Sequence, residues 1–370
     1  MPPKKVKSPE TPAQEKAKPV QRRKKRISPF RVIGRTLVVI ILSAVFLFVF
    51  LYSVCFVVTN GPSENARRLF VLSANETSAL KFLPYWFLPS DQVQAILNPP
   101  ASDAAPDLYR EIGYEPSGDA PVAEEEPEVV HIDEATFTDE LEIIDIRKPT
   151  FKGKLMIIHD PSRVIVGTLD HYGDRGMYLS EFVANNNAIA GTNAGSFYDP
   201  DGMGEGGTPD GLVMKDGRID WGSPGGWYTG VVGFDADYKL HVGNMSGQDA
   251  LNLGLQTAVS FAPGPTLIKD GVKATNLGGG VNPRTCVGQR ADGAVLLLVV
   301  EGRHPDSIGA TYDDLADLME EYGAVNAGNL DGGSSSAMIY DGVQITKGST
   351  IIGSRPMCNA ILVLREGGAH

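Results

Sequence analysis

The pattern of apolar and polar positions divides the chain into stretches of different character. Residues 36–58 form an uncharged run, TLVVIILSAVFLFVFLYSVCFVV. From about Ile146 onward, short apolar runs of strand length alternate with turns rich in glycine and aspartate. Between these two parts, residues 59–98 are mixed and residues 99–145 are strongly acidic. The pattern predicts one long N-terminal helix, a connecting region and one globular domain.

The globular part predicts many strands and few helices. Asp-Gly pairs follow or separate the apolar runs at 216–217, 270–271, 292–293 and 341–342. One helix is predicted over about 178–186. A second begins after Thr311, with Asp314 completing its N-terminal cap and Gly323 ending it. We therefore expect an α+β fold with a mixed, largely antiparallel sheet and a few packed helices. The predicted strands lie at 154–160, 163–169, 188–194, 211–217, 230–236, 239–243, 294–302 and 360–366.

The uncharged run is long enough to cross a membrane. As a helix, its 23 residues span the roughly 30 Å hydrocarbon core. A cleaved signal peptide is the alternative, but its apolar region is usually about 7–15 residues and ends at a small-residue site. Residues 1–35 carry 12 Lys/Arg and 2 Asp/Glu, whereas Arg67 and Arg68 follow the run. The positive-inside rule then predicts a single-pass membrane protein with a cytoplasmic N-terminus and an extracytoplasmic domain.

Composition predicts the role of each remaining segment. The basic residues beside the run suit anionic lipid headgroups and topology better than nucleic acid, which we do not expect as a partner. Phe82, Tyr85, Trp86 and Phe87 suit a membrane interface, and residues 91–97 suit a short helix. The expected order is a basic cytoplasmic arm (1–35), a transmembrane helix (36–58), a juxtamembrane segment (59–98), a flexible acidic linker (99–145) and the globular domain (146–370).

Three segments of the domain are candidates for chemistry: GTNAGSFYDPDG (191–202), NPRTCVG (282–288), and VVEGRHP followed by GNLDGGSSSAM (299–305 and 328–338). The turn after Asp331 could expose consecutive backbone N–H groups to an oxyanion, or it could be an ordinary Asp-Gly turn. Arg284 and Arg303 could grip phosphate in bidentate fashion, or pair with surface acids. The glycine-rich stretch 191–280 also holds large aromatic residues, which favours tight ligand-facing loops over a disordered linker.

Other chemistries are excluded or left open. The chain has no G-x-S-x-G, H-E-x-x-H or G-x-x-x-x-G-K-[ST] motif. Asp199, Asp201 and Asp210 could hold a hard cation, but their loops lack an EF-hand register, so we expect no metal and no other cofactor. Cys286 and Cys358 could form one disulfide or be two unlinked buried thiols.

At these segments the chain resembles the phosphodiester glycosidase family. The matching motifs occur in order as NAGSF (193–197), DGLV (210–213), PRTCVG (283–288), EGR (301–303) and NLDGGSSS (329–336). The chain departs from the family pattern where Ser196 replaces a Phe, Cys286 an Ala, Glu301 an Asp and Ser334 a Gly. Glu301 keeps the carboxylate but lengthens its reach. The resemblance does not extend to residues 1–145.

The resemblance implies hydrolysis of a sugar-1-phosphodiester to the sugar and a phosphomonoester. Glycoside cleavage usually uses two carboxylates, and the pair here is Asp331 and Glu301, with Arg284 stabilising the phosphate leaving group. The residues expected to bind substrate are Asn193, Asp210, Thr285, Arg303, Gly332, Gly333, Ser334 and Ser335.

The expected partner is a phosphodiester-linked glycan of the cell envelope or an exopolysaccharide, with membrane lipids contacting the N-terminal helix. Two other functions stay open. A non-catalytic glycan-binding module would bind the same ligand without turnover, and a sugar-phosphate transferase would form a new linkage.

Overall fold

The computed structural model describes residues 29–77, 80–98, 141–199, 204–262, 264–349 and 354–366. Residues 1–28 of the predicted basic arm and residues 99–140 of the predicted linker lie outside these ranges. Contacts divide the chain into two units, 1–55 and 56–370.

Helix α1 (Pro29–Asn60) contains the uncharged run. Its segment Ile33–Asn60 has a mean hydropathy of 2.9 and is long enough to cross a membrane. A signal sequence near the N-terminus would meet the same criteria.

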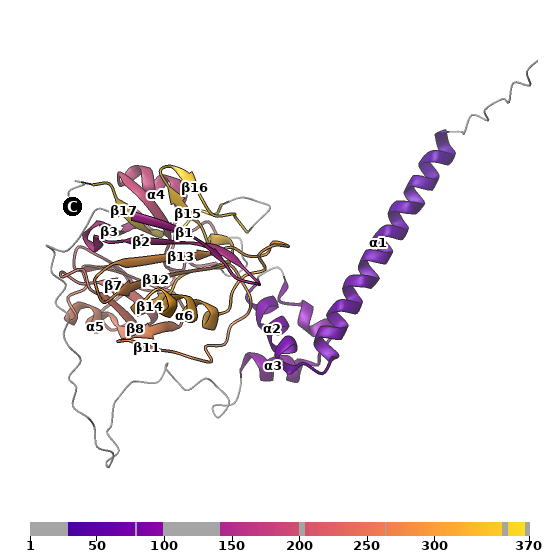
Figure 1. The fold of residues 1–370 in the computed structure, drawn as a ribbon, viewed down its shortest axis with the longest axis horizontal. Helices are drawn as coiled ribbons and strands as arrows, with labels where there is room; N and C mark the ends of the chain where they lie inside the picture. Colours follow the sequence, from indigo (N-terminus) through magenta and orange to yellow (C-terminus); the bar gives the residue numbers. More distant parts are fainter. Residues whose placement is uncertain are drawn as a thin grey trace, which may run out of the picture. The chain divides into compact units, whose positions relative to one another are not determined.

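The described residues of the 56–370 unit form three sheets, in which the paired strands are antiparallel (Figure 1). The seven-stranded sheet has the order β1-β2-β13-β12-β14-β10-β11. Its strands are β1 (Leu141–Arg147), β2 (Lys152–Ile158), β10 (Thr266–Lys269), β11 (Val272–Lys273), β12 (Arg284–Arg290), β13 (Val295–Val300) and β14 (Ala324–Asn329). Strand β1 thus begins within the range predicted for the linker.

The other two sheets have five strands each. The β4 sheet has the order β16-β15-β4-β17-β3, and the β7 sheet has the order β6-β5-β9-β7-β8. The β4 sheet consists of β3 (Val164–Thr168), β4 (Ala188–Asn193), β15 (Met338–Tyr340), β16 (Val343–Gln344) and β17 (Asn359–Leu364). The β7 sheet consists of β5 (Val213–Lys215), β6 (Arg218–Trp221), β7 (Trp227–Phe234), β8 (Leu240–Ser246) and β9 (Thr257–Ser260).

The main core lies where the three sheets meet. It includes Leu297 from the seven-stranded sheet, Ile361 from the β4 sheet and Val232 from the β7 sheet, all almost fully buried. Strand β13 is apolar at every position because its side chains alternate between two cores. Leu297 faces the main core, whereas Leu296 and Leu298 pack in a second cluster with helix α6 (Tyr312–Glu321).

Helices cover the outer faces of the sheets. Helix α6 packs on β10 and β14, and helix α4 (Leu179–Asn185) packs on β4 and β17. The short helix α5 (Gly247–Asn252) lies beside β6 and β8. Two short 3-10 helices also lie in the described part of the domain, η4 (Pro161–Arg163) and η5 (Gly333–Ser335).

The predicted fold class and the local signals behind it are confirmed. Helix α6 starts after Thr311 with a full capping box to Asp314 and ends before Gly323, whose φ is +82°. The turns at 216–217, 270–271 and 341–342 have positive φ at both residues, as two-residue hairpins require.

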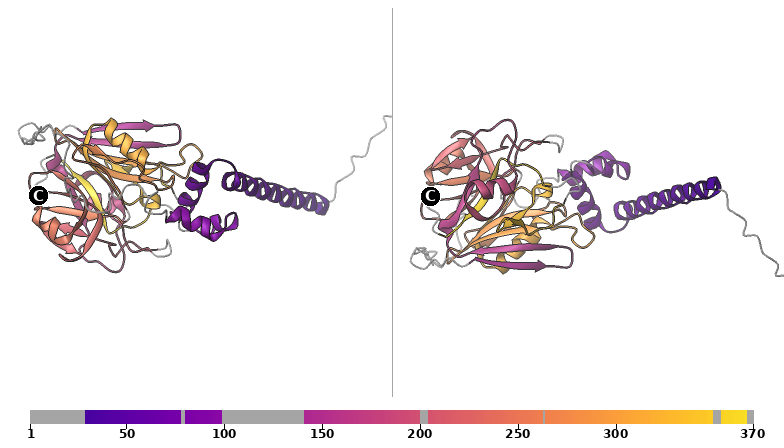
Figure 2. Two further views of the ribbon diagram at one scale, coloured as in Figure 1. Left: turned by 90° about the horizontal axis from the view of Figure 1, so that it is seen from below. Right: turned by 90° about the horizontal axis from the view of Figure 1, so that it is seen from above.

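A small helical segment precedes the domain in the chain. It consists of α2 (Glu64–Asn75), η2 (Leu83–Trp86) and α3 (Ser90–Leu97), and its core is Val71, Leu88 and Val93. Phe82, Tyr85 and Trp86, predicted to suit a membrane interface, are exposed. Figure 2 shows from two sides that α2 lies against one end of the domain, where its residues hydrogen-bond to residues 280–284.

Candidate functional site

Several strand ends bring the predicted motifs together. In the seven-stranded sheet, Arg284 at the start of β12 pairs with Val300 at the end of β13, and Cys286 pairs with Asn329 at the end of β14. The segments that contain Arg284, Glu301 and Asp331 therefore lie at the same end of three neighbouring strands. Strand β4 of the neighbouring sheet ends at Asn193.

Asn193 connects the two sheets through its buried amide. Its Nδ2 donates to the backbone oxygen of Asp331 at 2.6 Å. Its Oδ1 accepts from the Thr285 hydroxyl at 2.8 Å and from the Ala337 N–H at 3.2 Å. The Asp331 N–H donates in turn to the Ala194 oxygen at 2.8 Å. Because Asn193 is only 1% exposed, these bonds form without competition from water and fix the position of Asp331.

The Asp331 carboxylate lies in an environment that adjusts its protonation. Burial raises its pKa to about 6, while hydrogen bonds from the Ser335 hydroxyl and the Gly332 N–H act in the opposite direction. The positive charge of Arg355 also lowers this pKa, and the negative charge of Asp199 raises it. A carboxylate with a pKa near 6 is ionised at neutral pH yet can accept and release a proton.

The Gly332–Ser335 turn does not provide the row of free amides that the sequence suggested. The Gly332 N–H donates to Asp331 Oδ1 at 2.9 Å, the Gly333 N–H to the Pro283 oxygen at 2.9 Å, and the Ser335 N–H to the Gly332 oxygen at 3.1 Å. The expectation fails at these three residues because the turn closes as helix η5 and docks on the 283–284 segment.

Arg284 is held rigidly beside this turn. Its side chain is 4% exposed, and its guanidinium stacks over the Tyr312 ring at 3.9 Å. Its Nη2 donates to the Gly280 oxygen and to Glu76 Oε2, each at 2.7 Å. A Cβ added to Gly332 would lie 3.8 Å from Arg284 Cδ and 2.8 Å from the Pro283 oxygen. Glycine at 332 therefore allows the Asp331 turn to approach Arg284 closely.

Arg303 forms a second cationic group near the same turn. Its Nη2 lies 3.4 Å from Asn282 Oδ1 and 3.3 Å from where a Cβ of Gly333 would stand. Burial and the charge of Arg284 lower the pKa of Arg303, and the charge of Glu76 raises it. The guanidinium groups of Arg284 and Arg303 and the carboxylate of Glu76 therefore lie close together.

Glu301 and Asp210 have hydrogen-bond partners outside the Asn193 network. The Glu301 carboxylate accepts from the Lys347 N–H at 2.8 Å, which attaches it to another loop. Asp210 is exposed, and its backbone bonds with Ser196 in both directions. Burial raises the pKa of the Cys358 thiol, and the negative charges of Asp331 and Asp210 raise it further. The carboxylates of Asp331 and Asp210 therefore both lie near this thiol.

Arg355 is a site residue that the sequence patterns did not indicate. Its Nη1 donates to Asp199 Oδ2 at 2.7 Å and lies 3.4 Å from the Ser334 hydroxyl. Its guanidinium also lies 4.9 Å from the Phe197 ring. Arg355 stands outside every motif quoted above, and only the fold brings it to the motif containing Phe197.

Of the three aspartates considered as cation ligands, Asp199 forms an ion pair with Arg355. Asp201 lies outside the described residues, and Asp210 is exposed. Within the described part of the chain, no group of three or more His, Cys, Asp or Glu side chains is placed to hold a metal ion. Cys286 and Cys358, left open above, are both buried free thiols.

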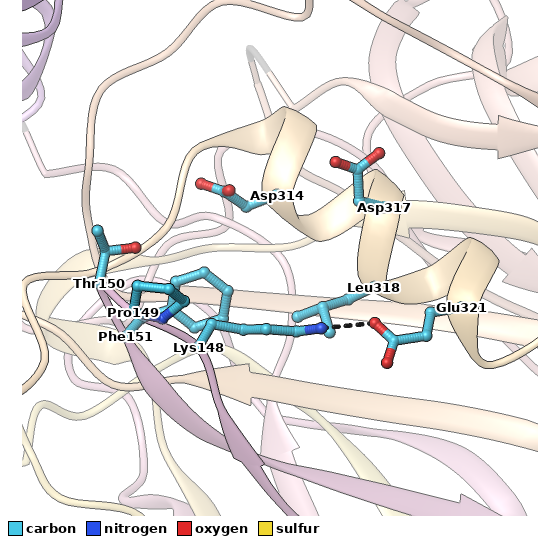
Figure 3. Close-up of a pocket in the computed structure, with 8 residues that line it drawn as sticks. All are labelled: Lys148, Pro149, Thr150, Phe151, Asp314, Asp317, Leu318 and Glu321. Atoms are coloured by element: carbon cyan, nitrogen blue, oxygen red, sulfur yellow. Dashed lines mark hydrogen bonds and ion pairs between the residues drawn. The ribbon is translucent and has the colours of Figure 1, made fainter.

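A separate pocket of about 320 Å³ lies between the β1–β2 turn and α6 (Figure 3). Figure 3 shows Lys148 extending along its mouth to Glu321, with which it forms an ion pair at 2.6 Å. Asp314 faces the pocket but accepts the Thr311 cap bonds. This pocket contains none of the predicted site residues. Its lining residues are Lys148, Pro149, Thr150, Phe151, Asp314, Asp317, Leu318 and Glu321.

The protonation of Asp331 gives a testable pH dependence. If the ionised carboxylate is the active form, kcat/KM falls as the pH decreases through about 6. Arg355→Gln removes a charge that lowers this pKa, so the acid limb of the pH profile should move to higher pH. Asp199→Asn removes a charge that raises it, and the limb should move to lower pH. Shifts in the same direction for both variants would contradict the assignment.

Comparison with known proteins supports the family resemblance. Residues 186–364 match the family model described as phosphodiester glycosidase. The SPbeta prophage-derived protein YomE of Bacillus subtilis (strain 168) is 34% identical over 146 residues, which are 36% of this chain and 22% of that protein. The chain thus spans about a fifth of the Bacillus protein.

One solved structure shows a similar fold. The zebrafish N-acetylglucosamine-1-phosphodiester alpha-N-acetylglucosaminidase catalytic domain, described as auto-inhibited by its pro-peptide, matches with a TM-score of 0.51 and 21% identity. The match covers 61% of this chain and 83% of that one. A putative exported protein of Burkholderia pseudomallei K96243 matches with a TM-score of 0.46 and 17% identity over 58% of this chain and 74% of that one. Residues 186–364, which include Asn193, Arg284 and Asp331, therefore resemble the phosphodiester glycosidase family.

Proposed function

We propose that this protein hydrolyses sugar-1-phosphodiester linkages, with Asp331 at the reacting centre. The observation that carries the proposal is the buried Asn193 amide, which joins Asp331 and Thr285 from different motifs. A fold that only needed stability would gain little from fixing a carboxylate of raised pKa, because such a group costs stability at neutral pH.

Catalysis of this reaction depends mainly on electrostatic stabilisation of the leaving phosphate. Water adds to the anomeric carbon, the bond from that carbon to the phosphate oxygen breaks, and the phosphate leaves as a monoester. Phosphate is a much weaker base than a sugar alkoxide, so its departure needs cationic stabilisation more than a proton donor. We assign that role to Arg284 and Arg303, which lie close to each other. The ionised Asp331 acts on the anomeric carbon, as a nucleophile or by activating water.

The roles of the remaining residues follow from their contacts. Because protein atoms already engage both ends of the Asn193 amide, we assign Asn193 and Thr285 to positioning Asp331. Glu301 is the second carboxylate, and its tie to Lys347 makes its position depend on the 347 loop. Asp210 and Ser334 are assigned to substrate hydroxyl groups. No step in this scheme needs an organic cofactor.

The proposed location is the outer face of a cell membrane. Support comes from the apolar segment Ile33–Asn60 and from the basic residues that precede it. A tethered domain on that side would meet phosphodiester-linked envelope glycans or exopolysaccharide, which contain the required linkage.

The test uses the full-length protein in detergent and a panel of sugar-1-phosphodiesters, beginning with an N-acetylglucosamine 1-phosphodiester. Phosphorus NMR distinguishes the diester from the phosphomonoester product. The proposal expects a phosphomonoester and free sugar from at least one member of the panel. Ligand binding without any product would indicate a glycan-binding module, and a new glycosidic or phosphodiester linkage would indicate a transferase.

A further inference from the structure

Two aromatic side chains form a pair outside the motifs of the candidate site. Trp221 ends β6, an edge strand of the β7 sheet, and Tyr172 lies in the loop between β3 and α4. The centroids of the two rings are 5.3 Å apart and their planes meet at 63°, an edge-to-face arrangement. Both residues are only partly buried. The pair therefore keeps part of its aromatic surface in contact with solvent.

Asp220 adds an acidic group to this pair. The Tyr172 hydroxyl donates to Asp220 Oδ2 at 2.5 Å, and Asp220 itself is exposed. Burial and the neighbouring Asp220 carboxylate raise the pKa of Tyr172, so its hydroxyl remains a donor to Asp220. An ionised carboxylate offers two oxygens with several acceptor positions. Asp220 can therefore accept further hydrogen bonds from a ligand beside the two rings.

The loop that contains Tyr172 is fixed to the glycine-rich loop between β4 and β5. The Gly173 N–H donates to the Gly207 oxygen at 2.8 Å, and the Thr208 hydroxyl donates to the Gly173 oxygen at 3.2 Å. A Cβ added to Gly207 would lie 2.5 Å from backbone atoms of Asp174, so the two loops are in direct backbone contact. Tyr172 is therefore held in position before any ligand binds.

Two separate contacts connect the aromatic pair to the candidate site. Tyr172 packs against the apolar cluster that contains Cys358, and the Asp210 carboxylate lies near the Cys358 thiol. Trp221 pairs across β5 and β6 with Val213, which is in the same DGLV motif as Asp210. The pair therefore lies on the Asp210 side of the site, and Asp210 is the residue assigned above to substrate hydroxyl groups.

A sugar ring fits this combination of groups. The C–H groups on one face of a pyranose carry weakly positive hydrogens, which are attracted to the negative face of an aromatic ring. Its hydroxyl groups can donate to a carboxylate such as that of Asp220. A phosphate group would be repelled by the same carboxylate, and a purely apolar ligand would leave it without hydrogen bonds. Aromatic surface with a few polar groups at fixed positions is also typical of small-molecule sites.

We propose that Tyr172, Trp221 and Asp220 form a subsite for a second sugar ring, joined to the sugar whose anomeric carbon reacts. Since the phosphate is assigned to the arginines and the hydroxyl groups of the reacting sugar to Asp210, the second ring lies on the side away from the phosphate. The inference rests on the proposed function for the identity of the reacting sugar. It narrows the substrate class to 1-phosphodiesters of oligosaccharides or polysaccharides.

The first experiment compares two substrates that differ by one sugar ring, N-acetylglucosamine 1-(methyl phosphate) and N,N′-diacetylchitobiose 1-(methyl phosphate), with full-length protein in detergent. We expect wild type to have an about tenfold lower KM for the disaccharide, because its second ring gains a stacking contact and hydrogen bonds. Trp221→Ala should remove this difference and leave the KM for the monosaccharide within about twofold of wild type.

The matched control is Trp86→Ala, at an exposed position of η2, which should keep the wild-type difference between the two substrates. Trp221→Phe retains an aromatic ring and should keep part of the difference, which a general loss of folding would not allow. Equal KM values for the two substrates in wild type, or an unchanged difference in a folded Trp221→Ala protein, would overturn the inference.

Tryptophan fluorescence tests the subsite without turnover. A sugar ring stacked on Trp221 displaces water from the indole, so its emission should shift when N,N′-diacetylchitobiose or cellobiose is added at millimolar concentration. Trp221→Phe should lose this shift, whereas Trp86→Phe should keep it. A shift without turnover of any diester would uphold the sugar subsite and refute the hydrolase. Turnover by wild type without any shift would uphold the hydrolase and refute the subsite.

Discussion

Asp331→Asn is expected to reduce kcat for a sugar-1-phosphodiester by at least about a thousandfold, because the amide can neither attack the anomeric carbon nor accept a proton. The asparagine has the same shape, and its Oδ1 can still accept from the Gly332 N–H. Substrate affinity should therefore stay within a few-fold of wild type. The measurement is steady-state kinetics on the full-length protein, with calorimetry of the same substrate bound to the inactive variant.

The stability of this variant provides its control. Burial raises the Asp331 pKa in the folded protein to about 6, above its value in the unfolded chain. The folded state therefore binds the proton more readily, and stability from this group increases as the pH falls through about 6. At pH 7 the ionised group costs stability, so Asp331→Asn should melt no lower than wild type. A large loss of both stability and activity would indicate a structural role for Asp331 instead.

Asn193→Ala is expected to lower both stability and activity. It leaves the Asp331 carbonyl, the Thr285 hydroxyl and the Ala337 N–H without their partner in a buried position. From the cost of unsatisfied buried polar groups, we expect a loss of about 3 kcal/mol in the free energy of unfolding. A small displacement of Asp331 should lower kcat/KM by about a hundredfold.

For Asn193→Ala, denaturant unfolding measures the loss of stability, and steady-state kinetics on the same preparation measures the loss of activity. The matched control is Asn252→Ala, at an exposed position on α5. It should change stability by less than about 0.5 kcal/mol and leave activity unchanged. Full activity in a destabilised Asn193→Ala protein would show that the amide serves the fold and not the positioning of Asp331.

Local signals made the fold class predictable from the sequence. The Thr311–Asp314 capping box, the glycine that ends α6 and the Asp-Gly hairpins are encoded within a few neighbouring residues. The grouping of strands into three sheets was not predictable in this way. It depends on pairings such as Ala360 with Asn193, which join residues far apart in the chain.

The same distinction between local and long-range information applies to the residues of the candidate site. The motifs containing Asn193, Arg284 and Asp331 could be found because each has an unusual local sequence. Arg355 and Glu76 could not, since their importance comes from partners far away in the chain, Asp199 and Arg284. The sequence left open whether the N–H groups after Asp331 are free, because an Asp-Gly-Gly-Ser sequence does not show which acceptors they find in the fold.

A structure of the Asp331→Asn protein bound to an intact sugar-1-phosphodiester tests the central claim most directly. Our account predicts the phosphate next to Arg284 and the anomeric carbon next to residue 331. A ligand bound elsewhere in the domain would contradict it.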